Sequence, residues 1–182
     1  QDTMENVKTG DALRERVVLL QKEDRVRQVG DAAKRAVEEV RKKEEEARRA
    51  ALRIPYSDED YQVMLKIVQA EAGGCDSTGK ILVANVIMNR VRSPLFPNTI
   101  SDTITEVVYQ KPQFSPVIDG SINRVKVTQD TIDCVNRALD GEDYSQGALY
   151  FMNRKASQAG NVSWFDGTLT YLFQHGSHEF FK

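Results

Sequence analysis

The chain of 182 residues has no apolar run that approaches the roughly 18 residues of a membrane-spanning helix. Cysteine is scarce: Cys75 and Cys134 match no metal-binding spacing, and they permit either one disulfide or two free thiols. Neither sign of charge is in excess, because 25 Lys and Arg residues stand against 27 Asp and Glu residues. This balance argues against a nucleic-acid partner. The sequence opens at Gln1 rather than Met, so we expect that any signal peptide or anchor has been removed or was never included.

Large apolar residues are also scarce in residues 1–54, where charged residues predominate. Gly10-Asp11-Ala12 recurs as Gly30-Asp31-Ala32, which indicates either one kinked helix or an αα-hairpin. We interpret the segment as a linker, a spacer or a weak coiled coil, and we expect residues 1–53 to mediate self-association or to bind an accessory protein. A coiled-coil seam with Lys43 as a defect is indicated by the spacing of Val26, Val29, Ala33, Ala36, Val40, Ala47, Ala50 and Ile54.

A compact domain is predicted for residues 55–182. Pro55 ends the charged segment, because proline cannot continue a helix. Ser57 and Asp60 then form a capping-box pattern, and Gly73-Gly74 is typical of a helix end. The sequence therefore predicts a helix between these two signals.

One acidic residue, Glu71, falls on the apolar face of that predicted helix. Desolvation on this face should raise the pKa of the carboxyl group, and the negative end of the helix dipole should add to the shift. A raised pKa suits a general acid. The alternatives are a Glu71 side chain that reaches solvent and one that pairs with an arginine such as Arg90. The apolar face is defined by Tyr61, Met64, Leu65, Val68 and Ala72.

More helices are predicted in the first half of this domain. Residues 79–91 are apolar on nearly every side, which is typical of a central buried helix, and Asn85 and Asn89 share one face of it. Ser101 is expected to cap a short helix through residue 109, and Thr128 to cap another that stops at the next glycine.

Strand patterns follow in the second half. Residues 148–152 are strand-like, and residues 162–165 and 168–173 flank Asp166-Gly167, a dipeptide typical of hairpin turns. Residues 177–181 are expected to add a last strand. The fold class is therefore α+β, with helices first and a small antiparallel sheet last, preceded by the charged helical segment.

A set of short motifs runs in order through residues 57–182. These motifs are Glu71-Ala72-Gly73-Gly74, Val83-Ala84-Asn85-Val86-Ile87-Met88-Asn89-Arg90-Val91, Phe96-Pro97, Gln113-Phe114-Ser115, Asp119-Gly120, Ala138-Leu139-Asp140-Gly141, Gly147-Ala148-Leu149-Tyr150-Phe151-Met152-Asn153, Trp164 and Gly176-Ser177-His178-Glu179-Phe180. The ordered set resembles the cell wall hydrolase family typified by the spore-cortex-lytic enzymes SleB and CwlJ.

The resemblance implies a lysozyme-like catalytic domain that cleaves the glycan of peptidoglycan, with Glu71 as its catalytic acid and no cofactor. It further implies lytic transglycosylase chemistry at the bond between N-acetylmuramic acid and N-acetylglucosamine, in which the muramic 6-hydroxyl closes a 1,6-anhydro ring. An exported enzyme of the cell wall or the spore cortex, acting in wall lysis or germination, is the corresponding expectation.

The chain departs from the family pattern at two positions. Cys75 and Lys80 stand where a second Glu and a Gln are usual, which leaves Glu71 as the only carboxylate of the motif. This suits a mechanism with a single acid. For Lys80 we favour a solvated side chain over one that contacts the substrate.

Several residues are candidates for binding the sugar. Gln113 and Phe114 lie in a loop bounded by two prolines, residues 110–116, where an amide and an aromatic ring suit sugar hydroxyls and stacking. Packing of Phe114 on the core is the alternative. The other candidates are Tyr150, Asn153, Trp164 and His178, of which Trp164 also suits a core position.

Three other functions remain open on the sequence. A hydrolytic muramidase would use Asp102, Asp119 or Asp166 as a second carboxylate that positions water. A zinc amidase would use His175 and His178, but no third ligand is convincing, so we expect no metal. A wall-binding or scaffold module without catalysis would leave Glu71 with a structural role.

Overall fold

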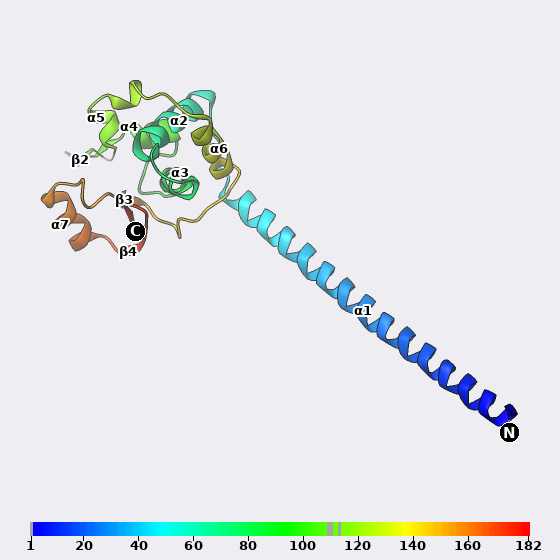
Figure 1. The fold of residues 1–182 in the computed structure, drawn as a ribbon. Coiled ribbons are helices and arrows are strands. Elements are labelled where there is room, and N and C mark those ends of the chain that lie inside the picture. Colours follow the sequence, from blue (N-terminus) through cyan, green and yellow to red (C-terminus); the bar gives the residue numbers. More distant parts are fainter. Residues whose placement is uncertain (1, 109–110, 113) are drawn as a thin grey trace. The chain divides into compact units, whose positions relative to one another are not determined.

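The computed structural model describes residues 2–108, 111–112 and 114–182 and divides into two units, residues 1–47 and 48–182. α1 (Asp2–Leu52) is one uninterrupted helix, so the helical prediction is confirmed and the αα-hairpin alternative is wrong (Figure 1). No helix in the described part of the chain is long and apolar enough to cross a membrane. Along α1 the exposed large apolar side chains include Leu13, Val17, Val18, Val26, Val29, Val37 and Val40.

Three of these exposed side chains, Val26, Val29 and Val40, belong to the seam from which self-association was predicted, whereas the other four lie outside it. Association of α1 with a second copy stays a prediction, and the molar mass of the protein in solution would check it.

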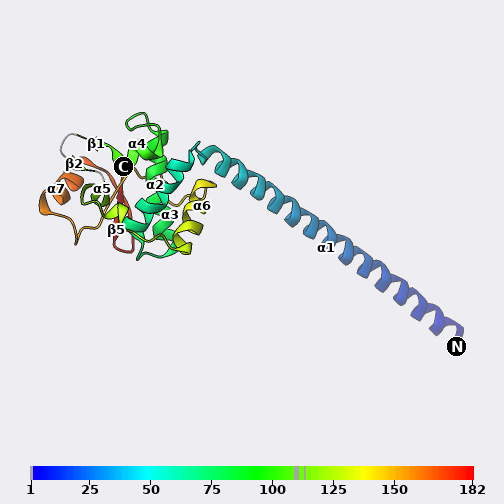
Figure 2. The same ribbon diagram turned by 90° about the horizontal axis from the view of Figure 1, so that it is seen from above.

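The helical part of the second unit is built around α2 (Asp58–Ala72), α3 (Ser77–Arg92) and α6 (Gln129–Leu139), which pack on one another (Figure 2). α4 (Ile100–Thr105) packs against α2 and α3. α2 begins with the predicted capping box, because the Asp60 N–H donates to Ser57 Oγ at 3.1 Å and the Ser57 N–H donates to Asp60 Oδ2 at 3.0 Å. The core among these helices includes Met64, Ile67, Val68, Ile81, Ile87, Ile100, Ile104 and Val135.

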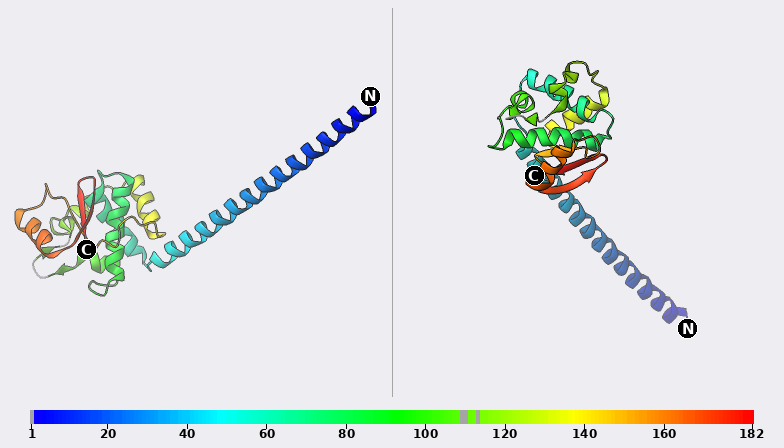
Figure 3. Two further views of the ribbon diagram at one scale, coloured as in Figure 1. Left: turned by 90° about the horizontal axis from the view of Figure 1, so that it is seen from below. Right: turned by 90° about the vertical axis from the view of Figure 1, so that its left-hand side faces the viewer.

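α3 is the central helix, as its apolar pattern predicted, and it is buried continuously from Gly79 to Arg90. One side of it packs on the helices, while Leu82 and Val86 pack with Phe180 of the sheet. The right-hand view of Figure 3 shows α3 between these two layers.

Asn85 and Asn89 share one face of α3, as predicted, and both bind the segment that leads to the sheet. Asn85 Nδ2 donates to the carbonyl of Glu142 at 2.8 Å, and Asn89 Nδ2 donates to the carbonyl of Ala148 and to Ser145 Oγ, each at 2.8 Å. These asparagines therefore satisfy buried backbone groups of the connection.

The sheet is antiparallel and has the strand order β3-β5-β4, formed by β3 (Tyr150–Met152), β4 (Tyr171–His175) and β5 (His178–Phe181). Phe180 is the partner of Phe151 on one side and of Phe173 on the other. Helices followed by a small antiparallel sheet, with a charged helix in front, confirm the predicted α+β class.

The predicted strand at residues 162–165 and its hairpin at Asp166-Gly167 are wrong, because this segment forms α7 (Ala159–Thr168). A four-residue apolar run carries too little periodicity to separate strand from helix, so tertiary contacts decided it. In the structure Arg154 donates to both Asp166 oxygens at 2.8 and 2.9 Å. The hairpin turn lies instead at Gly176-Ser177, where Gly176 has a φ of 57°.

The short helix predicted from Ser101 to residue 109 is also displaced. Thr99 is the cap, since its hydroxyl accepts the Asp102 N–H at 3.1 Å, whereas the Ser101 hydroxyl donates to Asp60 Oδ1 at 2.7 Å. The helix already ends at Thr105.

The segment beyond α4 is more regular than the loop that was predicted for it. β1 (Val107–Val108) pairs with β2 (Lys111–Pro112) in antiparallel orientation. α5 (Ser115–Ile118) and the 3-10 helix η1 (Ser121–Asn123) follow. α6 then begins at the predicted cap, with the Thr131 N–H donating to the Thr128 hydroxyl at 3.3 Å.

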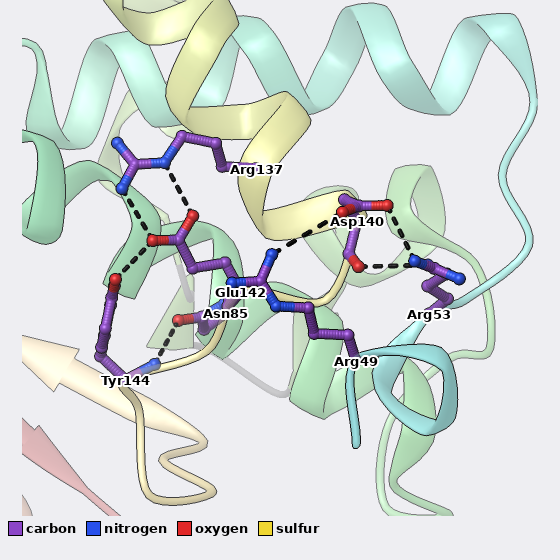
Figure 4. A network of polar contacts seen from close by, with 7 residues as sticks. All are labelled: Arg49, Arg53, Asn85, Arg137, Asp140, Glu142 and Tyr144. Atoms are coloured by element: carbon purple, nitrogen blue, oxygen red, sulfur yellow. Dashed lines mark hydrogen bonds and ion pairs between the residues drawn. The ribbon is translucent and has the colours of Figure 1, made fainter. Parts of the chain in front are cut away.

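The last turn of α1 belongs to the second unit and contacts the end of α6 (Figure 4). Arg53 donates to Asp140 Oδ1 at 3.0 Å and to the Asp140 carbonyl at 3.1 Å, and Arg49 lies 3.9 Å from Asp140 Oδ2. Ile54, which follows, is 8% exposed. Independent folding of residues 55–182 stays a prediction, and these contacts define what a shortened chain would lose.

Candidate active site

Glu71 lies in the last turn of α2, on the face predicted for it. Of the residues that define this face, Met64, Leu65, Val68 and Ala72 are buried, while Tyr61 and Glu71 remain partly exposed. Among the residues that the structure describes, none donates a hydrogen bond to the Glu71 carboxyl group. The group is therefore desolvated without compensation on its charged form.

The pKa of Glu71 is raised from 4.5 to about 7, first by burial and second by the negative charge of Asp119. The predicted direction and the first cause are confirmed. The second cause differs from the predicted helix dipole. Asp119 lies between α5 and η1, and hydrogen bonds from Ser121 keep its pKa below the ordinary value, so that it is charged at neutral pH.

If the protonated Glu71 starts the reaction, cleavage should fall as pH rises through about 7, because the acid form is lost there. Asp119→Asn should move this basic limb to lower pH, since it removes the negative charge that raises the pKa of Glu71. Initial cleavage rates of the two proteins between pH 4 and pH 9, read at about one-unit steps, would measure the shift. A basic limb that stays at the same pH in both proteins would contradict the coupling.

The chain immediately after Glu71 is held by the β4–β5 hairpin. His175 Nε2 lies 2.8 Å from Asp76 Oδ1, and the same Asp76 oxygen caps α3 by accepting the Gly79 N–H at 2.7 Å. His178 Nδ1 lies 4.0 Å from the Cys75 sulfur, and His178 is only 7% exposed. These contacts tie the end of the acid-bearing helix to the sheet.

His175 and His178, the two histidines considered as zinc ligands, contact Asp76 and Cys75, respectively. No cluster of three metal-ligating side chains occurs within residues 2–108, 111–112 and 114–182. Burial and the neighbouring charge of His175 lower the pKa of His178, which keeps its imidazole neutral at physiological pH. The His178 ring packs edge to face against the Phe151 ring, with 5.2 Å between the ring centres.

Arg90 lies within a cluster of aromatic rings instead of pairing with Glu71. Its guanidinium carbon is 4.9 to 5.1 Å from the ring centres of Phe96, Phe114 and Tyr150, and its Nε donates to the Leu149 carbonyl at 2.7 Å. The ion pair with Glu71 considered as an alternative is therefore wrong. Burial lowers the pKa of Arg90 to about 10, so it stays charged at neutral pH.

The predicted sugar-binding aromatics meet in this cluster. Tyr150 and Trp164 are both partly exposed, and their rings contact edge to face at 5.9 Å. Phe114 is 1% exposed and packs toward Phe151, so it supports the cluster from the core. Gln113 lies outside the described residues.

Asn153 lines a separate polar cavity of about 210 Å³ next to the β4–β5 turn. Its Oδ1 accepts the Ala156 N–H at 3.3 Å, which shapes the turn after β3. The other lining residues are Arg154, Lys155, Gln174, Gly176, Ser177 and Glu179.

One of the two departures from the family pattern, Lys80, has a partner within the domain. Lys80 is 4% exposed and forms an ion pair with Asp130, so the solvated side chain favoured from the sequence is wrong. Cys75 and Cys134 are both free thiols. The partner of Lys80 is therefore Asp130, in the first turn of α6. Because the two residues are fifty positions apart, no local sequence pattern predicts this ion pair.

The sequence profile of the family described as Cell Wall Hydrolase matches residues 74–181. The chain belongs to the Cell Wall Hydrolase family. Glu71 precedes the matched region by three positions, so the family match does not extend to it.

The chain is also similar in sequence to spore cortex-lytic enzymes. A spore cortex-lytic enzyme of Oceanobacillus iheyensis is 35% identical over 127 residues, or 70% of this chain and 43% of that protein. A spore cortex-lytic enzyme of Halalkalibacterium halodurans is 37% identical over 105 residues, or 58% of this chain and 30% of that protein. The chain therefore spans less than half the length of these relatives.

A solved structure with the same fold is the catalytic domain of the germination-specific lytic transglycosylase SleB from Bacillus anthracis. It is 33% identical, with a TM-score of 0.59, and the match covers 71% of this chain and all of that domain. The catalytic domain of Bacillus cereus SleB matches similarly, with 32% identity and a TM-score of 0.57.

Proposed function

We propose that this protein is a lytic transglycosylase that cleaves peptidoglycan between N-acetylmuramic acid and N-acetylglucosamine, with Glu71 as its general acid and base. The observation that carries the proposal is the half-buried Glu71 carboxyl group, whose pKa is raised to about 7. At neutral pH such a group is present in both protonation states, which is what a residue that first gives and then takes a proton requires.

The reaction uses this one carboxyl group twice. Protonated Glu71 donates its proton to the glycosidic oxygen, and the bond to the muramic C1 breaks. Carboxylate Glu71 then accepts the proton of the muramic 6-hydroxyl, whose oxygen bonds to C1 and closes the 1,6-anhydro ring. No water is consumed, and Glu71 ends in its protonated form, so that the proton count balances.

Other features of the domain support this use. Cys75 leaves the motif without a second carboxylate, and Lys80 is neutralised by Asp130. Tyr150 and Trp164 offer partly exposed rings to a sugar, and Phe114 is buried against Phe151, while Asn153, His178 and Gln113 are weaker candidates. By likeness to the spore cortex-lytic relatives, we infer an exported protein that acts on cortex or cell wall.

A hydrolytic muramidase is the second candidate. Of the three aspartates considered as its second carboxylate, Asp119 is favoured, because its charge acts on Glu71. Asp166 is bound by Arg154, and no charge effect of Asp102 on Glu71 is found. In a muramidase, Asp119 would position the attacking water.

Product masses separate the two candidates. Purified sacculi digested by the protein should release muropeptides with anhydro ends, about 18 mass units lighter than their hydrolysed counterparts because no water is added. Asp119→Asn should retain this product. Hydrated reducing ends, lost in Asp119→Asn, would establish the muramidase instead.

A further inference from the structure

A second pocket lies at the opposite end of α2 from Glu71. Its volume is about 350 Å³, within the range of small-ligand sites. Ten residues of helix separate Tyr61, beside this pocket, from Glu71, which corresponds to about 15 Å along the axis. The pocket is lined by Arg53, Ile54, Tyr56, Asn136, Leu139 and Asp140.

The walls of this pocket are fixed by contacts between its own side chains. The Tyr61 hydroxyl donates to Asn136 Oδ1 at 2.8 Å, and the Tyr56 ring stacks on the Tyr61 ring at 6.2 Å with an interplanar angle of 28°. Arg53 binds both the carboxylate and the carbonyl of Asp140, as the close-up of α6 shows (Figure 4). The aromatic wall and the polar wall are therefore held before any ligand arrives.

The chemistry of the lining favours a neutral ligand rich in hydroxyl and amide groups. The Asp140 carboxylate is compensated by Arg53 and by Arg49, which lies 3.9 Å from it, so the pocket offers no free negative charge to a cation. Tyr56 is 49% exposed, whereas Ile54 and Leu139 are 8% and 5% exposed, which leaves one accessible ring above a mostly covered apolar floor. Asn136 accepts through Oδ1, and its Nδ2 donor has no partner among the described residues.

We propose that this pocket is an accessory binding site for the N-acetylated sugars of a glycan strand. A pyranose ring would stack its C–H face on Tyr56, and its hydroxyl and acetamido groups would bind Asn136 Nδ2 and the Asp140 carboxylate. The choice of sugar rests on the proposed function, because a protein that cleaves wall glycan meets long strands. A glycan strand bound at this pocket stays close to the enzyme, which raises its effective concentration at Glu71.

Titration of the Glu71→Gln protein with tetra-N-acetylglucosamine, followed by backbone amide NMR, tests this site without cleavage of the ligand. We expect two separate sets of shifted amides, one at Tyr56, Asn136 and Leu139 and one next to position 71. Adding Tyr56→Ala or Asn136→Ala should weaken the first set by about fivefold or more and leave the second unchanged. Tyr171→Ala is the matched control, because Tyr171 is 51% exposed and lies outside the pocket.

The outcomes separate this site from the proposed function. Shifts only near position 71, or pocket shifts that survive Tyr56→Ala and Asn136→Ala, would overturn the accessory site and leave the function in place. Shifts only in the pocket would support the site and count against the function. No shift at either place would overturn the accessory site and also count against the function.

Discussion

Replacing Glu71 with Gln is expected to reduce glycan cleavage by about 10²- to 10⁴-fold, the usual contribution of a general acid or base. The amide keeps the shape of the side chain but can neither donate the proton to the glycosidic oxygen nor accept one from the 6-hydroxyl. Turbidity loss of purified sacculi and release of muropeptides measure the effect. Glu59→Gln is the matched control, because Glu59 is an exposed glutamate in the first turn of the same helix.

A second measurement shows whether the Glu71→Gln protein is inactive for the proposed reason. The folded protein binds the Glu71 proton more tightly than the unfolded chain, since the pKa is raised from 4.5 to about 7. The contribution of this group to the free energy of unfolding should therefore be greatest below pH 4.5 and should fall by at most roughly 3 kcal/mol as pH rises to about 7. Glu71→Gln should lack this fall. Substantial cleavage by a folded Glu71→Gln protein would remove the central claim.

Gly141→Ala should destabilise the second unit by about 2–4 kcal/mol, through backbone strain and steric overlap together. Gly141 has a φ of 103°, which side chains rarely permit, and an added Cβ would lie 2.7 Å from Arg49 Cα and 2.8 Å from the Arg49 carbonyl carbon. Denaturant unfolding measures the loss. Gly147→Ala is the control, because Gly147 also has a positive φ, 75°, but its added Cβ meets only the end of Lys182, at 3.5 Å.

The same substitution tests the boundary of the compact domain. A shortened chain that begins at Ile54 lacks Arg49, so Gly141→Ala should cost no more there than Gly147→Ala does. The shortened chain itself should fold, since the contacts of Arg49 and Arg53 with Asp140 are surface ion pairs of about 1 kcal/mol or less each. A shortened chain that fails to fold would show that the last turn of α1 is part of the core.

The sequence predicts local structure correctly where that structure depends on residues close together in the chain. The capping box of Ser57 and Asp60 and the cap at Thr128 are formed by residues three apart, so the sequence contains the whole interaction. The prediction of a strand at residues 162–165 is wrong, because the segment is part of α7. In this helix Trp164 packs on Tyr150, and Asp166 accepts hydrogen bonds from Arg154. These partners come from other elements, and a short apolar run does not encode them.

The sequence by itself determined the α+β order, the buried central helix and the acidic residue on the apolar face of α2. Helical period and burial are properties of one segment, and a carboxyl group among apolar neighbours must have a raised pKa wherever the fold buries them. Only the tertiary structure decided that Asp119 acts on Glu71, that Arg90 lies among three rings, and that Lys80 is buried with Asp130. Coulombic and packing partners are chosen by distance in space, which residue spacing along the chain does not specify.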